Sequence, residues 1–400
     1  MIDDIKSSNT LEDNNKDLEK NYMAVKDAPI DDADDELKPK VTEKDAKPPK
    51  KSRFHLTKKQ KIIIAIIVPL LLLIIGFGVW YFVLRSKPQA AVQTPPPVVE
   101  VTPGATAITS NLTGLEVTAD VNERTVTGVM VENSPDARPQ SGLKDAGVVY
   151  EAVAEGGITR FLTLFQDTQP EYIGPVRSVR PYYLDFLSPY GAAIAHVGGS
   201  GEALSQIKAQ NIRDLDQFAN SSAYWRESSR YAPHNVYTNM LKLKELEKQK
   251  GFTKVDYQGF ERGGPTEAAE TPTAKAINIK MSSTLYNVNY AYDVSTNSYK
   301  RSEGGKPHVD AKSNSQLSPK VLVVPIIPRT QNGIYSVYAV NGTGKVLVFQ
   351  NGTVTEGTWQ KADRKSQFKF IGTDGQPLKL SAGQTWVTIA ATSADVTFTP

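Results

Sequence analysis

The chain has 400 residues, a formal net charge of +3 and no cysteine. The absence of cysteine excludes disulfides, thiolate metal sites, a cysteine nucleophile and attachment of a lipid to cysteine. The small net charge gives no sign of a surface for nucleic acid, so no nucleic-acid partner is expected.

The N-terminal part of the chain predicts a membrane anchor behind a polar tail. Residues 1–61 are rich in Asp, Glu, Lys and Asn, which is typical of a disordered segment. Residues 62–84 carry no charge, and a helix of roughly 23 residues is long enough to cross a bilayer. Basic residues precede this run, so the positive-inside rule places the N-terminus in the cytoplasm and the remainder outside. A cleaved signal peptide is the alternative, but its apolar region spans only about 7–15 residues.

After a Pro-rich linker, residues 85–110, two folded domains are expected. In the first, residues 111–258, apolar runs alternate with helical stretches, which indicates an α/β or α+β arrangement. The predicted elements are strands over 125–132, 147–153 and 160–166, a helix over 181–187, a strand over 192–197, and helices over 202–209 and 240–250.

The second domain, residues 274–400, lacks helical periodicity. Asn-Gly or Asp-Gly pairs at 332–333, 341–342, 351–352 and 374–375 separate short apolar or alternating runs, which is the strongest short-range signal for hairpins. An antiparallel β sandwich or barrel is therefore expected. The predicted fold class is α+β: a single transmembrane helix, then an α/β-type domain and an antiparallel β domain.

The first cluster of candidate residues lies in a predicted hairpin. If the glycine pair at 156–157 forms a two-residue turn, Val153 pairs with Arg160. Glu151, Glu155 and Arg160 then share a face, and Arg160 lies diagonally between the two carboxylates. The cluster is either a structural group of ion pairs or part of a site in which Glu151 or Glu155 is an acid or base.

Arg177 and Arg180 form a second cluster, just before Pro181. The proline disfavours the α conformation at Arg180 and places that residue at the mouth of the next helix. Unpaired N–H groups at a helix N-terminus and the bidentate fork of arginine favour a carboxylate or phosphate there. Ordinary surface arginines are the alternative interpretation.

A glycine-rich turn follows the predicted strand over 192–197 and forms the third cluster. His196 lies near the strand end, Gly198 and Gly199 form the turn, and Ser200 is a candidate helix N-cap. In open α/β sheets, ligands bind beyond the carboxyl ends of strands. The glycine spacing matches neither the dinucleotide fingerprint nor the P-loop, so no cofactor is expected. His196 is either a hydrogen-bonded core residue or a ligand or base.

The remaining candidates lie on two loops. Arg230, His234 and Asn235 surround Pro233, and His234 could transfer a proton.

In the second domain, Lys306, His308 and Asp310 would lie on one side of an extended segment. Their spacing could orient an imidazole through a carboxylate or supply two metal ligands. With no third ligand in view, no metal is expected.

Nine segments carry a family resemblance. They are Arg138-Pro-Gln-Ser-Gly-Leu143, Tyr150-Glu-Ala, Glu155-Gly-Gly-Ile-Thr-Arg-Phe161, Ile173-Gly-Pro-Val-Arg-Ser-Val-Arg-Pro-Tyr182, His196-Val-Gly-Gly-Ser200, Ala232-Pro-His-Asn235, Gly304-Gly-Lys-Pro-His-Val-Asp310, Gly357-Thr-Trp359 and Gly383-Gln-Thr-Trp386. Together they resemble the YerB-like putative lipoprotein family of bacteria. The resemblance covers about residues 110–395 and implies two domains and a cell-envelope location, without an established activity. Family members are described as lipoproteins, whereas this chain has no cysteine to acylate, and the predicted helix would replace the lipid.

The leading hypothesis is an anchored ectodomain that binds an anionic envelope ligand. Its expected ligand-binding residues are Arg160, Arg177, Arg180, Gly198, Gly199, Ser200, Arg230 and Asn235. The competing hypothesis is a hydrolase or transferase acting on cell-wall glycan or phosphate polymers, with Glu151, Glu155, His196 or His234 as catalytic candidates. A third, a scaffold for membrane proteins, predicts an exposed apolar patch on the β domain. We expect the clusters between residues 151 and 235 to converge on one cleft.

Overall fold

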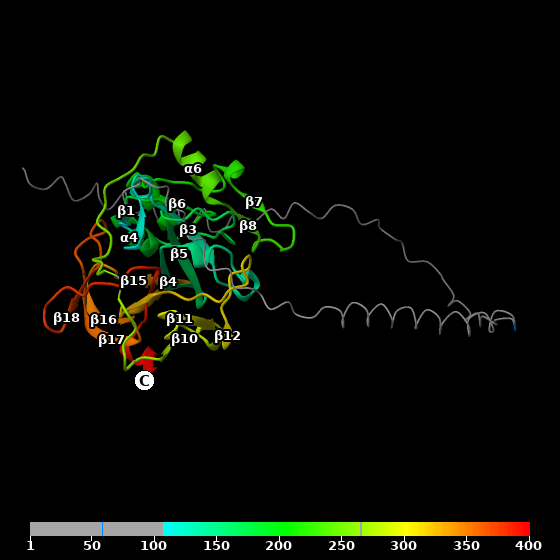
Figure 1. Cartoon of the computed structure of the whole chain (residues 1–400). Helices are drawn as coiled ribbons and strands as arrows, with labels where there is room; N and C mark the ends of the chain where they lie inside the picture. The colour runs from blue at the N-terminus through cyan, green and yellow to red at the C-terminus, as the bar shows by residue number, and fades with distance from the viewer. Residues whose placement is uncertain (1–57, 59–106, 265) are drawn as a thin grey trace, which may run out of the picture. The chain divides into compact units, whose positions relative to one another are not determined.

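The computed structural model describes Lys58, residues 107–264 and residues 266–400. The predicted tail, apart from Lys58, the predicted transmembrane helix and residues 85–106 of the linker lie outside the described residues. No helix in the described part of the chain is long and apolar enough to cross a membrane. The described residues from 107 onward belong to one compact unit, which is coloured cyan to red in Figure 1.

The N-terminal half confirms the predicted order of elements, with small shifts at their ends. The predicted elements are β3 (Thr127–Glu132), β4 (Val148–Glu155), β5 (Ile158–Phe165), α4 (Pro181–Leu187), β6 (Ala193–Ala195), α5 (Gly201–Ala209) and α6 (Met240–Gln249). Further short elements are β1 (Ala107–Thr109), β2 (Glu116–Thr118), α3 (Ala119–Asn122), β7 (Trp225–Arg226) and β8 (Val236–Tyr237), with 3-10 turns η1 (Pro135–Ala137), η2 (Leu143–Asp145), η3 (Ser188–Tyr190) and η4 (Ser221–Ala223).

The C-terminal half is built from strands, as the turn signals predict. They are β9 (Ala276–Ile279), β10 (Val288–Asp293), β11 (Ser298–Glu303), β12 (Lys306–Pro307), β13 (Val321–Pro325), β14 (Arg329–Asn332), β15 (Tyr335–Tyr338), β16 (Gly342–Gln350), β17 (Thr353–Lys361), β18 (Lys369–Gly372), β19 (Thr385–Thr388) and β20 (Val396–Thr399), with η5 (Thr284–Tyr286) and η6 (Ser393–Asp395). Two predicted turns connect paired strands, β14 with β15 and β16 with β17. The pair at 341–342 does not, because β15 pairs with β14 and β4 instead of β16.

One large sheet joins the two halves of the chain. Its strand order is β18-β17-β16-β13-β19-β4-β5-β3-β6, and a smaller sheet has the order β12-β11-β10-β9-β20. β19 lies between β13 and β4 and is parallel to both, whereas most other pairs in the C-terminal half are antiparallel. The two predicted domains therefore share a sheet.

The large sheet is buried on both faces, and this explains why its central strands read as continuous apolar runs. Successive residues of β3, such as Val129 and Met130, belong to different core clusters. One cluster includes the smaller sheet and residues of α6, and the other includes α4 and residues of α5. In Figure 1, α6 and β6 to β8 lie at one end of this unit and β10 to β12 at the other.

Candidate functional site

The turn between β4 and β5 forms as predicted, but the register differs. The glycine pair at 156–157 has φ of 56° and 81°, and Glu155 pairs with Ile158. A bulge between Val153 and Glu155 then shifts the ladder, so that Ala152 faces Arg160 instead of Val153. Because adjacent residues of a strand point to opposite faces, the predicted sharing of one face by Glu151 and Arg160 is wrong.

Glu155 nevertheless holds two of the predicted arginines. Its carboxylate contacts the guanidinium of Arg160 through one oxygen and, through the other, both Nε and Nη2 of Arg180 at 3.0 Å. Arg160 also donates to the carbonyl of Ser178 at 2.8 Å, and Arg180 packs over the ring of Tyr335. Burial and the neighbouring charge of Arg160 lower the pKa of Arg180. Both arginines are buried and already paired.

Glu132 connects these arginines to the next group, although sequence patterns did not single it out. It is the cross-strand partner of Arg160 on β3 and β5. Its carboxylate lies 3.4 Å from Nε of Arg177 and 3.0 Å from Nδ1 of His234. Glu132 is the last residue of an apolar strand, so no sequence pattern marked it as a site residue. Arg160, Arg177, Arg180 and His234 therefore lie in neighbouring clusters, and the expected convergence of all clusters on one cleft stays a prediction.

Ser134 completes a group of serine, histidine and glutamate. Its Oγ lies 3.2 Å from Nδ1 of His234 and donates to Glu132 at 3.0 Å. A nucleophilic relay needs serine and carboxylate on opposite nitrogens of the imidazole. Here both meet Nδ1 of His234, so the three residues are not arranged as a catalytic triad.

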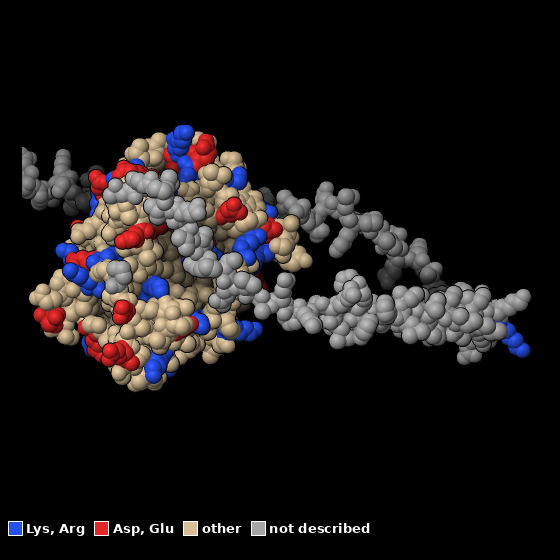
Figure 2. Space-filling view, in the orientation of Figure 1, with Lys and Arg blue, Asp and Glu red and all other residues tan. Residues whose placement is uncertain are grey.

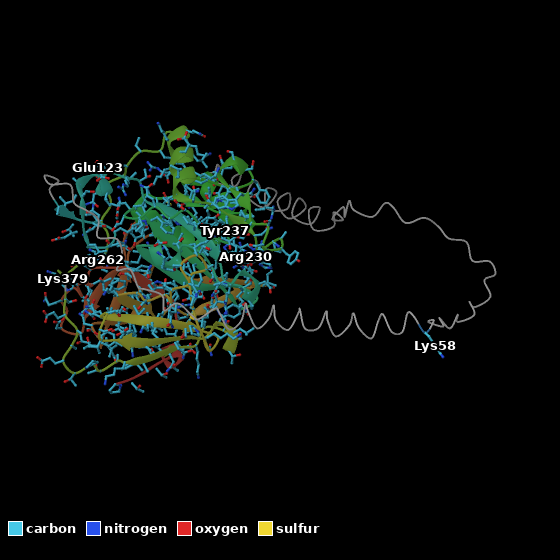
Figure 3. The ribbon with its side chains drawn as sticks, turned by 45° about the vertical axis from the view of Figure 1, so that its right-hand side comes forward. Lys58, Glu123, Arg230, Tyr237, Arg262 and Lys379 are labelled. Carbon is cyan, nitrogen blue, oxygen red and sulfur yellow. The ribbon has the colours of Figure 1, made fainter. Side chains whose placement is uncertain are left out.

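Arg230 differs from the other arginines in its partners. Its guanidinium donates to the carbonyls of Asp136, at 3.1 Å, and Pro139, at 2.5 Å. Within residues 107–264 and 266–400, no carboxylate lies within ion-pair distance of it. It borders a cavity of about 670 Å³, lined by Asp136, Ser229, Arg230, Tyr231, Ala232 and His234. Figure 3 labels Arg230 beside Tyr237, on the hairpin that β7 and β8 form.

Asn235 supports this loop. Its side chain accepts a hydrogen bond from Arg226 at 2.7 Å and donates to the carbonyl of Arg230 at 3.2 Å. Asn235 is buried, so its visible role is to hold Arg230 in place.

His196 lies apart from the cavity and is fully buried. Its Nδ1 lies 2.8 Å from the carbonyl of Gly198, and its Nε2 lies 3.0 Å from Asp214. Burial raises the pKa of Asp214, but the hydrogen bond and charge of His196 lower it more. Ser200 caps α5 by accepting from the backbone N–H of Ala203, which confirms the predicted N-cap. The packing of His196 is that of a core residue.

Within the same turn, Gly198 and Gly199 are half-buried. The N–H of Gly198 donates to Asp216, and its carbonyl accepts from Val179. A role of this turn in ligand binding stays a prediction.

Glu151 points to the opposite face of the sheet, toward the C-terminal strands. It accepts from Nη2 of Arg301 at 2.8 Å and from Thr388 at 3.2 Å. Arg301 also donates to Tyr290 and packs over Trp386, with 4.4 Å between guanidinium carbon and ring centroid. Glu151 and Arg301 are fully buried. This ion pair joins the two halves where no substrate has access.

His308 belongs to the same buried network, but its partners differ from those predicted. Nδ1 accepts from Arg301 at 3.0 Å, so Nε2 carries the proton donated to Gln140 at 2.8 Å. Burial and the charge of Arg301 lower the pKa of His308 well below its usual value. Asp310 instead accepts from the backbone of Gly142 at 2.7 Å. The predicted orientation of His308 by Asp310 is therefore wrong.

Lys306, the third candidate of that loop, is exposed. In the part of the chain that the structure describes, no group of three or more His, Asp or Glu could hold a metal ion.

Glu303 is the most perturbed carboxyl near these residues. It is 4% exposed; Oε1 accepts from Asn133 at 2.6 Å, and Oε2 has no hydrogen-bond partner among the described residues. Burial raises the pKa of Glu303 to about 7, despite the nearby Arg301 and Arg138. Glu303, Arg138 and Lys306 border a cavity of about 410 Å³. The sequence motif that starts at Gly304 begins one residue after this carboxyl.

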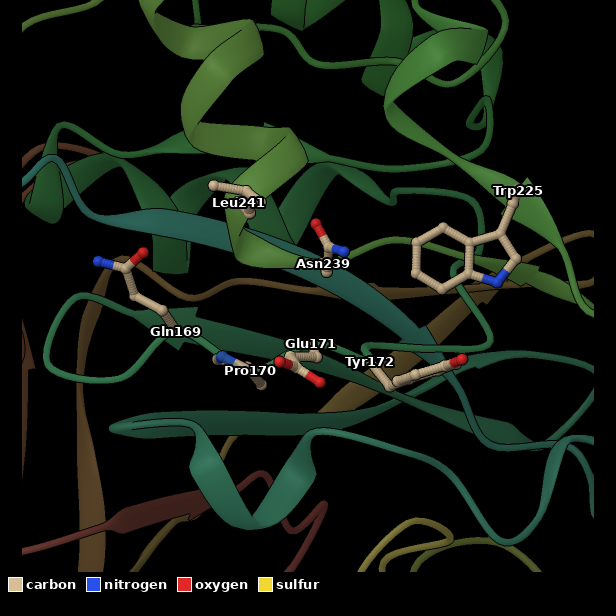
Figure 4. A pocket seen from close by; sticks show the side chains of 7 residues that line it. All are labelled: Gln169, Pro170, Glu171, Tyr172, Trp225, Asn239 and Leu241. Atoms are coloured by element: carbon tan, nitrogen blue, oxygen red, sulfur yellow. The ribbon is translucent and has the colours of Figure 1, made fainter.

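A further cavity, of about 410 Å³, lies at the start of α6. It is lined by Gln169, Pro170, Glu171, Tyr172, Trp225, Asn239 and Leu241 (Figure 4). The rings of Tyr172 and Trp225 stand perpendicular, with centroids 5.5 Å apart. No sequence motif pointed to this cavity, because its residues come from three separate segments.

Comparisons with known proteins give the family. Residues 112–253 match the N-terminal domain, and residues 277–387 the C-terminal domain, of a protein of unknown function (DUF3048). The chain is 33% identical over 288 residues to the putative lipoprotein YerB of Bacillus subtilis (strain 168), covering 70% of this chain and 85% of that protein. The chain belongs to this YerB-like family. The crystal structure of the YerB protein from Bacillus subtilis matches with a TM-score of 0.67 and 28% identity, over 73% of this chain and all of that one.

Proposed function

We propose that this YerB-like protein is an envelope protein anchored by residues 62–84, whose folded part binds an anionic envelope ligand outside the cell membrane. The family relative, a putative lipoprotein, supports a membrane-associated, extracytoplasmic location. The uncharged run at 62–84 supports a helical anchor in a chain that has no cysteine for a lipid.

One observation carries the anionic ligand: Arg230 borders the 670 Å³ cavity with only backbone carbonyls as partners in the described residues. Its positive charge is therefore available to a carboxylate or phosphate, which arginine binds in a bidentate manner. His234 lies in the same cavity, and Arg177 shares the carboxylate of Glu132 with it. Figure 2 shows basic and acidic side chains interspersed on the visible face, so a local site is favoured over a broad charged surface.

Arg160 and Arg180 have a different role in this proposal. Because both are buried against the shared carboxylate of Glu155, they position the ends of β4, β5 and α4 and do not contact the ligand. The buried Glu151 and His196 likewise maintain the fold. Binding is therefore favoured over hydrolysis, and incubation with envelope polymers is expected to release no product.

The test is binding of the full chain to glycerol-phosphate polymer and to soluble peptidoglycan fragments with acidic peptide stems. Arg230→Ala should weaken binding about 10- to 100-fold, the scale of a hydrogen bond to a charged group of about 1.5–3 kcal/mol. Arg213→Ala is a matched control, because Arg213 also donates to a backbone carbonyl, that of Thr253, outside the cavity. Equal affinities of the two variants for both probes would contradict the proposal.

The anchor is tested separately. Protease added to intact cells should digest the folded part and leave the tail, residues 1–61, protected. Deletion of residues 62–84 should abolish retention in the membrane fraction. Retention after this deletion would show that another feature of the chain holds it there.

A further inference from the structure

We infer that the cavity beside Tyr172 and Trp225 is a saccharide subsite and that the ligand is a glycan carrying anionic groups. This inference rests on the proposed function, because it extends the ligand from the Arg230 cavity along the β7–β8 hairpin. It assigns the sugar rings to the aromatic cavity and the anionic substituent to Arg230.

The aromatic walls are the first observation. Tyr172 and Trp225 meet at 88°, and Figure 4 shows the indole broadside with the phenol edge-on below it. Other groups fix both rings: the ammonium of Lys312 lies 3.5 Å from the centroid of Tyr172, and Tyr237 lies along Trp225. Rigid aromatic faces suit the C–H faces of a pyranose, which are apolar and slightly positive, because the ring face is slightly negative.

The polar lining is the second observation. Gln169, Glu171 and Asn239 line the same cavity, with Asn239 above Gln169 and Glu171 in Figure 4. The side chains of Gln169 and Glu171 make no hydrogen bond to the described residues, and the Oδ1 of Asn239 caps α6 while its amide nitrogen is free to donate. Planar donors and acceptors beside an apolar wall are the arrangement by which pockets orient a polar ligand.

Charge decides which ligand enters. Glu171 lines this cavity, and the ammonium of Lys312 lies on the ring of Tyr172. The two charges offset each other, so the cavity does not favour a carboxylate or phosphate, and the hydroxyl and amide groups of a neutral sugar suit it. The volume of about 410 Å³ lies within the range of small-ligand pockets, about 300–1,000 Å³.

Residues of the β7–β8 hairpin line both cavities. Trp225 pairs with Tyr237 at its base, and Arg230 and His234 lie on the loop between β7 and β8. The five Cα–Cα steps from Trp225 to Arg230 span at most about 18 Å, at roughly 3.6 Å per step. An oligosaccharide with an acidic substituent can cover a span of this size and so reach both cavities.

The test uses the neutral tetramer of N-acetylglucosamine and the full-length protein. Of the described tryptophans, Trp359 and Trp386 are buried and Trp225 is half-buried, so the tetramer should protect Trp225 from acrylamide quenching. Trp225→Ala and Tyr172→Ala should each weaken tetramer binding at least 10-fold, and Phe218→Ala should not. Phe218 is an aromatic residue, 73% exposed, that does not line the cavity.

Outcomes for the two sites are separable. If the tetramer does not bind, or binds Trp225→Ala as it binds the native chain, the saccharide subsite is refuted, whatever Arg230 does. If the tetramer binds through Trp225 but Arg230→Ala leaves the affinity for acidic glycan unchanged, the anion site fails and a neutral-glycan subsite survives. If Trp225→Ala weakens binding of the tetramer, Arg230→Ala weakens binding of the acidic glycan, and both variants keep the native melting temperature, one continuous site is supported.

Discussion

At the scale of single residues, several buried charges of this protein lie in ion pairs. Arg160 is 2% exposed and shares Glu155 with Arg180, and Arg301 is fully buried against Glu151. A buried charge without a partner is costly, whereas a matched pair is close to neutral for stability. Such residues respond strongly to removal of one partner.

Replacing Arg160 by Met should lower the free energy of unfolding by about 3 kcal/mol. The substitution keeps much of the volume but leaves the carbonyl of Ser178 and one oxygen of Glu155 without their donor. Urea denaturation measures the change, and Arg213→Met, at a half-exposed position, should cost less than about 1 kcal/mol. Equal losses in the two variants would mean that Arg160 is not a structural charge.

Glu303 makes stability depend on pH. Its pKa of about 7 in the folded state exceeds the ordinary carboxyl value, so the folded protein holds a proton that the unfolded chain has released. The contribution of Glu303 to stability is therefore highest below the unfolded pKa and falls as pH rises through 7. Gln does not titrate, so the stability of Glu303→Gln relative to the native chain should increase between pH 5 and pH 8. An equal difference in the free energy of unfolding between the two chains at both pH values would contradict this.

At the scale of elements, turn chemistry predicted most of the strands, but not their partners. Asn351 and Gly352, both at positive φ, connect β16 and β17 as the Asn-Gly signal predicts. The ladder shift in β4 has no such signal, because a bulge depends on what the two faces pack against. The bulge shifts the pairing by one residue, so Glu151 and Arg160 point to opposite faces of the sheet. The prediction that they share one face was therefore wrong.

Two glycines allow the stability cost of backbone strain to be compared with that of steric crowding. Gly352 and Gly375 both have φ of 78°, but a Cβ at Gly352 would lie 2.5 Å from the ring of Tyr292, whereas nothing lies within 4 Å at Gly375. Gly375→Ala should cost about 1 kcal/mol for the left-handed conformation alone. Gly352→Ala should cost about 1–3 kcal/mol more, the scale of overpacking. Thermal denaturation compares them, and equal costs would mean that the ring of Tyr292 moves freely aside.

The candidate site shows a similar limit. Sequence patterns found Arg177, Arg230 and His234, because each lies in a Pro- or Gly-containing segment. The patterns missed Glu132 and Glu303, which end apolar or alternating strands. Their hydrogen-bond partners lie more than a hundred positions away in the sequence. The patterns also missed Trp225, since an isolated aromatic residue indicates a binding surface only once Tyr172 stands beside it.

At the scale of the whole molecule, the shared sheet makes the halves interdependent. β4 pairs with β5 on one side and with β19 on the other, and Trp386 of β19 packs on Phe161 of β5. Residues 107–258 and 274–400, expressed separately, should each lack a cooperative melting transition, and mixing them should restore one. Differential scanning calorimetry measures this. Independent transitions of both fragments would show two autonomous domains.

The position of β19 in the sheet also determines when β4 gains its second neighbour during biosynthesis. Thr388 meets Glu151 across 237 residues of sequence, so the ribosome adds this neighbour of β4 long after β4 itself. Until then β4 presents an unpaired edge, which invites wrong pairing with other chains. A chain that emerges slowly, N-terminus first, cannot close its central sheet early. Closure of the central sheet therefore waits for β19, which turns the free edge of β4 into an interior position of the sheet.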